Sequence, residues 1–207
     1  MANKSKISIE NRIIARIRAR NGGVVSIDDL LDAGPRSAID QALSRLVKLG
    51  TIQRVRRGLY AWPKMNTLLG RQQTLPPDEL VQAWAKKNGL RVIPSGALTA
   101  NLLGLSTQVP AKIVYYTNGR SKTLNLGPYT IKLLNRGPKT MDVHGNISSL
   151  VFQALRYLGK NAVTSQIIKK LSQKLGAKDK MELRRNALYA AAWMKPVIEK
   201  IAGRKKT

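Results

Sequence analysis

The sequence predicts an α+β protein in three parts, and three observations carry this prediction. Apolar residues recur at helical spacing over residues 5–20 and 37–49. Short apolar runs separated by turn residues occupy residues 90–134, and helical spacing returns from residue 147 onward. With 207 residues, 43% of them hydrophobic, the chain can bury an ordinary core. We expect domains at residues 1–65, 75–140 and 141–207.

The first predicted elements are a helix, a very short strand and a second, short helix. Residues 5–20 place isoleucines at helical spacing, and Asn21-Gly22-Gly23 ends that helix. Val24-Val25 follows as a short extended piece. Ser26 and Asp29 have the spacing of a capping box, with Asp in place of Glu, and predict a helix over residues 27–32.

A third helix is predicted over residues 37–49, between a Gly-Pro turn and Gly50. One face of this helix is apolar. The opposite stripe is free of acidic residues, and all its side chains can donate hydrogen bonds to phosphates or base edges. The stripe consists of Ser37, Gln41, Ser44, Arg45 and Lys48.

The segment TIQRVRRGLYAW then predicts a two-stranded hairpin whose tip is Arg56-Arg57-Gly58. This order of elements is that of a winged helix-turn-helix, in which the second helix of the pair enters the major groove and the wing brings arginines to a phosphate or the minor groove. The expected DNA-binding residues are Arg36, Ser37, Gln41, Ser44, Arg45, Lys48, Arg54, Arg56 and Arg57. Two other interpretations stay open: a winged helix used for protein interaction, and a polar stripe that is only a solvated face.

Residues 63–77 contain three prolines and little periodicity, which predicts a linker. Beyond it the middle part is predicted to be a small α+β unit, with a hairpin at Asn118-Gly119. The third part is predicted to be all-helical, with a long last helix from about Asp179 that Pro196 kinks or breaks. The middle elements are helices over 78–88 and 97–103 and strands over 90–93, 111–117, 122–126 and 129–134.

The charge of the chain indicates a polyanionic partner. Lys and Arg number 37 against 11 Asp and Glu, for a net charge of +26. The excess is spread along the chain: 13 basic and 5 acidic residues in 1–65, 10 and 2 in 66–140, and 14 and 4 in 141–207. A basic surface throughout favours contact with a nucleic-acid backbone. The alternative is a basic surface that keeps the protein in solution and binds no nucleic acid.

Composition also excludes several classes of site. The chain has no Cys, and its one His, His144, lies in a polar turn, so we expect no metal and no cofactor. Only Asp78 and Glu79 occur between Asp40 and Asp142, too few carboxylates to hold Mg²⁺ for phosphoryl transfer, so we do not expect an enzyme. No apolar run is long enough for a membrane span and no secretory signal is evident, so we expect a cytoplasmic protein.

The stretch GGVVSIDDLLDAGPRSAIDQALSRLVKLGTIQRVRRGLYAW resembles the N-terminal domain of AbiEi-type antitoxins, from type IV (abortive infection) toxin–antitoxin systems. LPPDELVQAWAKKNGLRVIPSGALTANLLGLSTQVPAKIVYYTNG resembles the second domain of that family, and together the two blocks cover roughly residues 5–135. The resemblance implies a bacterial transcriptional repressor that binds double-stranded DNA at its own promoter. It also implies a nucleotidyltransferase-like toxin as functional partner. The resemblance does not reach residues 140–207, and the oligomeric state is left open.

A different class of function competes with this one: a basic RNA-binding or ribosome-associated protein. Tyr115, Tyr116 and Tyr129 lie on predicted strands with basic neighbours. Tyrosines on a sheet can stack on the bases of single-stranded RNA. Because neighbouring side chains alternate across a strand, either Tyr115 or Tyr116 must face inward.

Overall fold

The computed structural model describes residues 8–19, 23–66, 70–108, 110–143 and 145–203, except for the side chains of residues 64–66, 71 and 72. The fold is α+β, as predicted. The chain divides into two compact units. The N-terminal unit is Met1–Leu90 with Asn125–Tyr129, and the C-terminal unit is Arg91–Leu124 with Thr130–Thr207.

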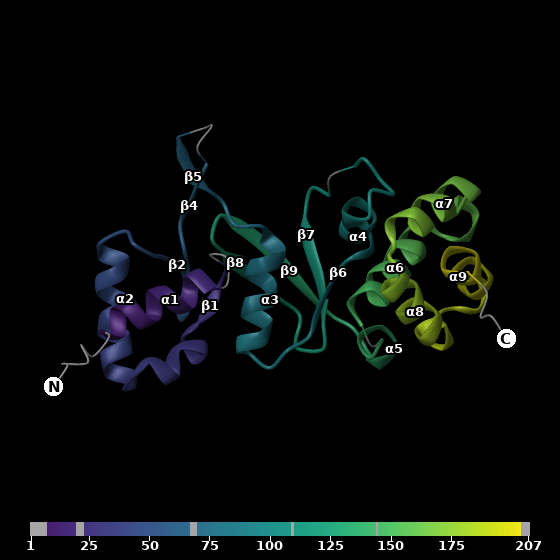
Figure 1. Ribbon diagram of the computed structural model, residues 1–207. Coiled ribbons are helices and arrows are strands. Elements are labelled where there is room, and N and C mark those ends of the chain that lie inside the picture. The colour runs from purple at the N-terminus through teal and green to yellow at the C-terminus, as the bar shows by residue number, and fades with distance from the viewer. Residues whose placement is uncertain (1–7, 20–22, 67–69, 109, 144, 204–207) are drawn as a thin grey trace. The chain divides into compact units, whose positions relative to one another are not determined.

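The N-terminal unit begins with three helices around one apolar core (Figure 1). They are α1 (Ile9–Ala19), the 3₁₀ helix η1 (Ile27–Ala33) and α2 (Arg36–Lys48). The predicted short helix therefore exists, but with the tighter 3₁₀ winding. Its predicted capping box is confirmed: Ser26 Oγ accepts from the Asp29 N–H, and Asp29 Oδ2 accepts from the Ser26 N–H at 3.0 Å.

A three-stranded sheet closes this core, with β3 (Leu59–Ala61) between β1 (Val25–Ser26) and β2 (Gln53–Arg56). Both pairings are antiparallel, with Val25 opposite Tyr60 and Gln53 opposite Ala61. The register shifts between Arg54 and Arg56, so the β2 strand bulges near the hairpin tip. The β2–β3 hairpin turns through Arg57-Gly58, where Gly58 adopts a φ of +75° that favours glycine.

The predicted linker is wrong in part. Residues within it form an antiparallel hairpin of β4 (Lys64–Asn66) and β5 (Arg71–Gln73), which extends away from the helices of its unit in Figure 1. Each strand has only three residues and no apolar alternation, so the periodicity that reveals longer strands is missing. The helix α3 (Pro77–Lys87) follows, with Leu80, Val81 and Trp84 buried.

A four-stranded sheet comes next, in the order β6 (Val92–Pro94), β7 (Ile113–Thr117), β9 (Tyr129–Asn135) and β8 (Lys122–Leu126). The hairpin predicted at Asn118-Gly119 is wrong, because β7 pairs in parallel with β9 and not with β8. The two residues of the expected turn bond to residues outside β8. Asn118 Oδ1 accepts from the Arg91 N–H, and Asn135 Nδ2 donates to the Gly119 carbonyl at 2.8 Å.

In the C-terminal unit, α6 lies against α4 (Figure 1) and contacts α8, while α9 packs on α7 and α8. Their shared core includes Ala100 and Leu103 beside Phe152, Leu171, Leu183 and Ile198. The helices are α4 (Gly96–Leu102), α5 (Pro138–Met141), α6 (Asn146–Leu158), η2 (Lys160–Ala162), α7 (Ser165–Lys174), α8 (Ala177–Arg185), η3 (Asn186–Tyr189), η4 (Ala192–Met194) and α9 (Lys195–Ala202).

The long last helix predicted from Asp179 is wrong: α8 ends at Arg185 and α9 begins only at Lys195. At the break, the buried Asn186 side chain donates a hydrogen bond to Ser148 Oγ at 3.0 Å. Pro196 stands in the first turn of α9, where a missing N–H costs nothing. The proline therefore opens a helix and does not kink one.

The two units also cut across the boundaries expected at 1–65, 75–140 and 141–207. The helix α3 belongs to the N-terminal unit, because Lys86 and Lys87 bond to Asp29 and to the Arg57 carbonyl. The C-terminal helices share their core with α4, so they do not form a unit of their own. Within the described part of the chain, no helix is both long and apolar enough to cross a bilayer.

Candidate nucleic-acid interface

The helix α2 has a buried face and an exposed polar face. Ile39, Ala42, Leu43 and Leu46 are buried against α1 and η1. The predicted stripe lies on the other side, and all five of its side chains are exposed: Ser37, Gln41, Ser44, Arg45 and Lys48. Packing of the apolar face fixes the rotation of the helix, so the sequence periodicity alone decides which side chains meet solvent.

Two of the predicted arginines of this segment are paired with carboxylates. Arg45 Nη1 lies 3.1 Å from Glu10 Oε1 of α1, and the Arg45 side chain is 65% exposed. Arg36 Nε lies 3.2 Å from Asp40 Oδ2, one turn later on α2. Pairs this exposed contribute little to stability, about 0–1 kcal/mol. Both guanidinium groups can therefore exchange a carboxylate for a phosphate or a base at small cost.

The hairpin exposes the other three predicted residues, Arg54, Arg56 and Arg57. The strand β2 alternates between half-buried and exposed positions, which turns Arg54 and Arg56 outward. Arg56 Nη1 donates to the Asn125 carbonyl at 2.9 Å. The side chain of Arg57 is exposed while its carbonyl accepts from Lys87 Nζ at 3.0 Å.

Three residues outside the expected DNA-binding set, Arg18, Trp62 and Lys87, make contacts at the hairpin or directly after it. The Arg18 guanidinium lies over the Trp62 ring, 4.6 Å from its centroid. Lys87 approaches the hairpin tip so closely that a Cβ on Gly58 would collide with its amine. No local signal reveals such contacts, because α3 reaches the hairpin only once the chain has folded back.

Two of the three tyrosines of the competing RNA hypothesis, Tyr115 and Tyr116, are adjacent on β7 and so face opposite sides of the sheet. Tyr115 is fully buried, whereas Tyr116 is half-buried with the Arg136 guanidinium 4.7 Å from its ring centroid. The sequence required one of the two to face inward, and the structure selects Tyr115. A continuous platform of stacking tyrosines is therefore absent from these two strand positions.

The model of one protein family matches residues 9–183, which is most of the chain. The chain belongs to DUF6088. This is a family of unknown function, so membership of DUF6088 relates the chain to others without assigning a role. No curated protein matches the sequence. Among solved structures, the chain is similar to the RV2827C protein from Mycobacterium tuberculosis, with 14% identity and a TM-score of 0.46 over 93% of this chain and 81% of that one.

Proposed function

We propose that the protein is a DNA-binding transcriptional repressor of its own operon and the antitoxin of a type IV toxin–antitoxin system. The observation that carries the DNA-binding part is the exposure of all five stripe residues of α2, opposite a fully apolar buried face. A helix face that carries neutral polar and basic side chains but no acidic one suits the major groove.

The arrangement of the N-terminal unit supports a winged helix-turn-helix. Its elements run α1, β1, η1, α2, β2, β3, and β3 lies between β1 and β2. In this proposal α2 is the recognition helix, and Arg45 and Gln41 read guanine and adenine by paired hydrogen bonds. The hairpin is the wing, where Arg54, Arg56 and Arg57 contact phosphates or the adjacent minor groove.

The test is binding to the DNA upstream of the gene, measured by fluorescence anisotropy at fixed salt. A shuffled duplex of the same length and a transfer RNA serve as competitors. We expect the upstream DNA to bind at least about 10³-fold more tightly than the shuffled duplex, the lower end for specific recognition. Equal or tighter binding of the transfer RNA would favour the RNA-binding alternative and contradict the proposal.

A pair of double variants makes this test specific for α2. Arg45→Ala with Lys48→Ala removes two charges from the exposed stripe, and we expect the preference for upstream DNA to fall by at least about tenfold. Lys178→Ala with Arg185→Ala removes the same two residue types from exposed positions on α8. We expect that control to keep the preference ratio.

The antitoxin part rests on the resemblance to AbiEi-type proteins and needs its own experiment. The functional partner is a nucleotidyltransferase-like toxin, and the site of action is the cytoplasm. Induction of a nucleotidyltransferase-like gene beside this one should arrest growth, and co-expression of the full chain should restore it. Arrest that persists despite co-expression would contradict this part and leave the DNA-binding part standing.

A further inference from the structure

The C-terminal unit contains a cavity of about 520 Å³ that plays no part in the proposed DNA contact. Pockets for small ligands typically measure about 300–1,000 Å³. Every lining residue belongs to this one unit. The lining residues come from the start of α4, from β7, from the segment after β9 and from the last turns of α6.

Sequence spacing explains why polar groups converge there. Gln153, Arg156 and Tyr157 stand at i, i+3 and i+4 on α6 and so share one face of that helix. Val114 and Tyr116 stand at i and i+2 on β7, so they line the cavity while Tyr115 is buried on the other side of the strand.

Two helices that line the cavity, α4 and α6, approach each other closely. A Cβ added to Gly96 at the start of α4 would lie 2.6 Å from Tyr157 Cβ and 2.8 Å from the Gln153 carbonyl oxygen. Only glycine permits this approach. The side chains of α6 thereby lie directly beside the first turn of α4.

The described lining contains two arginines and no acidic residue. Arg156 is half-buried, and burial lowers the pKa of its guanidinium, opposed by the neighbouring Tyr116. Because no carboxylate lines the cavity, we expect an anionic ligand to stabilise this half-buried guanidinium. Arg136, exposed at the rim, brings a second guanidinium over the Tyr116 ring.

Gln153, one of the lining residues, has a buried amide nitrogen without a hydrogen-bond partner. Gln153 as a whole residue is only 4% exposed, and its Nε2 makes no hydrogen bond within the described structure. An unpaired buried donor costs about 1–3 kcal/mol, so a ligand acceptor at this position is favoured. The amide also provides the pair of hydrogen-bonding groups that suits the edge of a planar base.

We infer that this cavity binds a small aromatic anion, of the class of a nucleoside monophosphate. The two guanidinium groups of Arg136 and Arg156 receive the phosphate. A planar base stacks on the Tyr116 ring or on the guanidinium above it. The Gln153 amide bonds the edge of the base. The sequence gives no local motif for this site, since its residues come from four elements far apart along the chain.

Isothermal titration of the full-length protein with the four ribonucleoside 5′-monophosphates tests the inference. Adenosine, inorganic phosphate and a single-stranded oligoribonucleotide serve as comparison ligands. We expect at least one monophosphate to bind with a Kd below about 0.1 mM, at least about tenfold more tightly than either adenosine or phosphate alone. Phosphate binding as tightly as every nucleotide, or no nucleotide binding below 1 mM, would overturn it.

Three variants show whether binding occurs in this cavity. Arg156→Gln and Arg136→Gln should each weaken nucleotide binding at least about tenfold. Arg120→Gln, an exposed arginine outside the lining, should leave the Kd unchanged. Because Arg136 is exposed, its variant is expected to fold even if the half-buried Arg156 is not replaceable. Unchanged nucleotide binding by folded Arg136→Gln, or tight binding of the oligoribonucleotide alone, contradicts the inference.

Discussion

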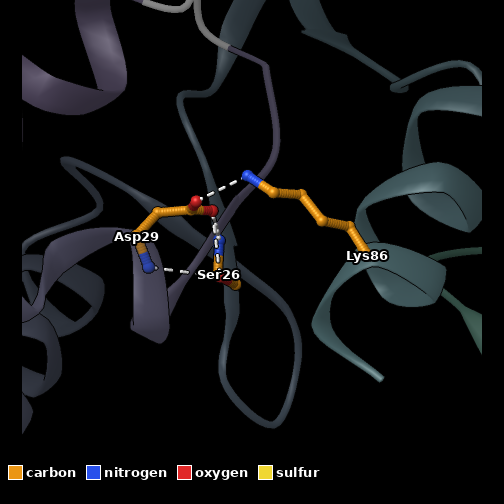
Figure 2. Close-up of polar contacts among 3 residues, drawn as sticks. All are labelled: Ser26, Asp29 and Lys86. Atoms are coloured by element: carbon orange, nitrogen blue, oxygen red, sulfur yellow. Dashed lines mark hydrogen bonds and ion pairs between the residues drawn. The ribbon is translucent and has the colours of Figure 1, made fainter. Parts of the chain in front are cut away.

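Lys86 Nζ of α3 lies 2.8 Å from Asp29 Oδ1, the second oxygen of the carboxylate that caps η1 (Figure 2). The other oxygen accepts both the N–H and the hydroxyl of Ser26. A single carboxylate thus completes the capping box at the N-terminus of a 3₁₀ helix and joins α3 to it. The Asp29 side chain is 15% exposed, while that of Lys86 is 65% exposed, so most of the stabilisation belongs to the cap.

The first prediction follows from this difference. Asp29→Ala removes the carboxylate half of the capping box and the ion pair together, and should lower the free energy of unfolding by about 1–2 kcal/mol. Lys86→Met removes only the exposed partner and should cost less than about 1 kcal/mol. Urea denaturation measures both, with Asp28→Ala on the exposed neighbour as a control expected within about 0.5 kcal/mol. If Lys86→Met were as unstable as Asp29→Ala, the ion pair and not the cap would provide most of the stabilisation, which would contradict this prediction.

The second prediction concerns Arg45 as a base-reading side chain. Arg45→Ala should weaken binding to upstream DNA by about 1–3 kcal/mol and relax the preference at one position of the site. Arg16→Ala on α1, another exposed arginine paired with a carboxylate, is the matched control. Anisotropy titrations over single-base variants of the duplex measure the effect. A loss that is equal for all sequences would make Arg45 a phosphate contact.

The third prediction uses the carboxylate that holds Arg45. Glu10→Gln removes the charge paired with the guanidinium, 3.1 Å away, and should tighten DNA binding by about two- to fivefold. Glu199→Gln makes the same change at an exposed position of α9 and corrects for the gain in net charge. Weaker binding by Glu10→Gln would mean that Glu10 orients Arg45 for the duplex.

The fourth prediction concerns the hairpin arginines as phosphate contacts. Arg56→Ala should weaken binding to all duplexes alike and reduce the slope of log affinity against log salt by about one unit. The measurement is a titration series over potassium chloride concentration with upstream and shuffled DNA. An unchanged slope would show that Arg56 serves only its bond to the Asn125 carbonyl.

The fifth prediction separates backbone strain from collision at the hairpin tip. Gly50 and Gly58 both have a φ near +70°, but only at Gly58 would a Cβ meet another side chain, Lys87. Gly50→Ala should therefore cost about 1–2 kcal/mol from the left-handed backbone alone, and Gly58→Ala more. Adding Lys87→Ala to Gly58→Ala should recover part of the excess in thermal or urea denaturation. No recovery in the double variant would place the whole cost in the backbone.

The sequence predicted features that depend on neighbouring residues. The rotation of α2 follows from the spacing of Ile39, Leu43 and Leu46, and the cap of η1 from the three-residue spacing of Ser26 and Asp29. The exposure of the stripe needs no distant contact, because an amphipathic helix buries its apolar face wherever the core lies. All nine expected DNA-binding residues are exposed in the structure.

The tertiary structure decided whatever depends on residues far apart in the chain. It paired β7 in parallel with β9 where Asn118-Gly119 favoured a hairpin, and it ended α8 where Asn186 reaches Ser148. It joined Lys86 to Asp29, 57 residues earlier, and gathered Gln153, Arg156 and Tyr116 around one cavity. Strand order and long-range contacts reflect which packing of the whole chain buries the most apolar surface while satisfying its polar groups. Local propensities do not distinguish between these alternative packings of the whole chain.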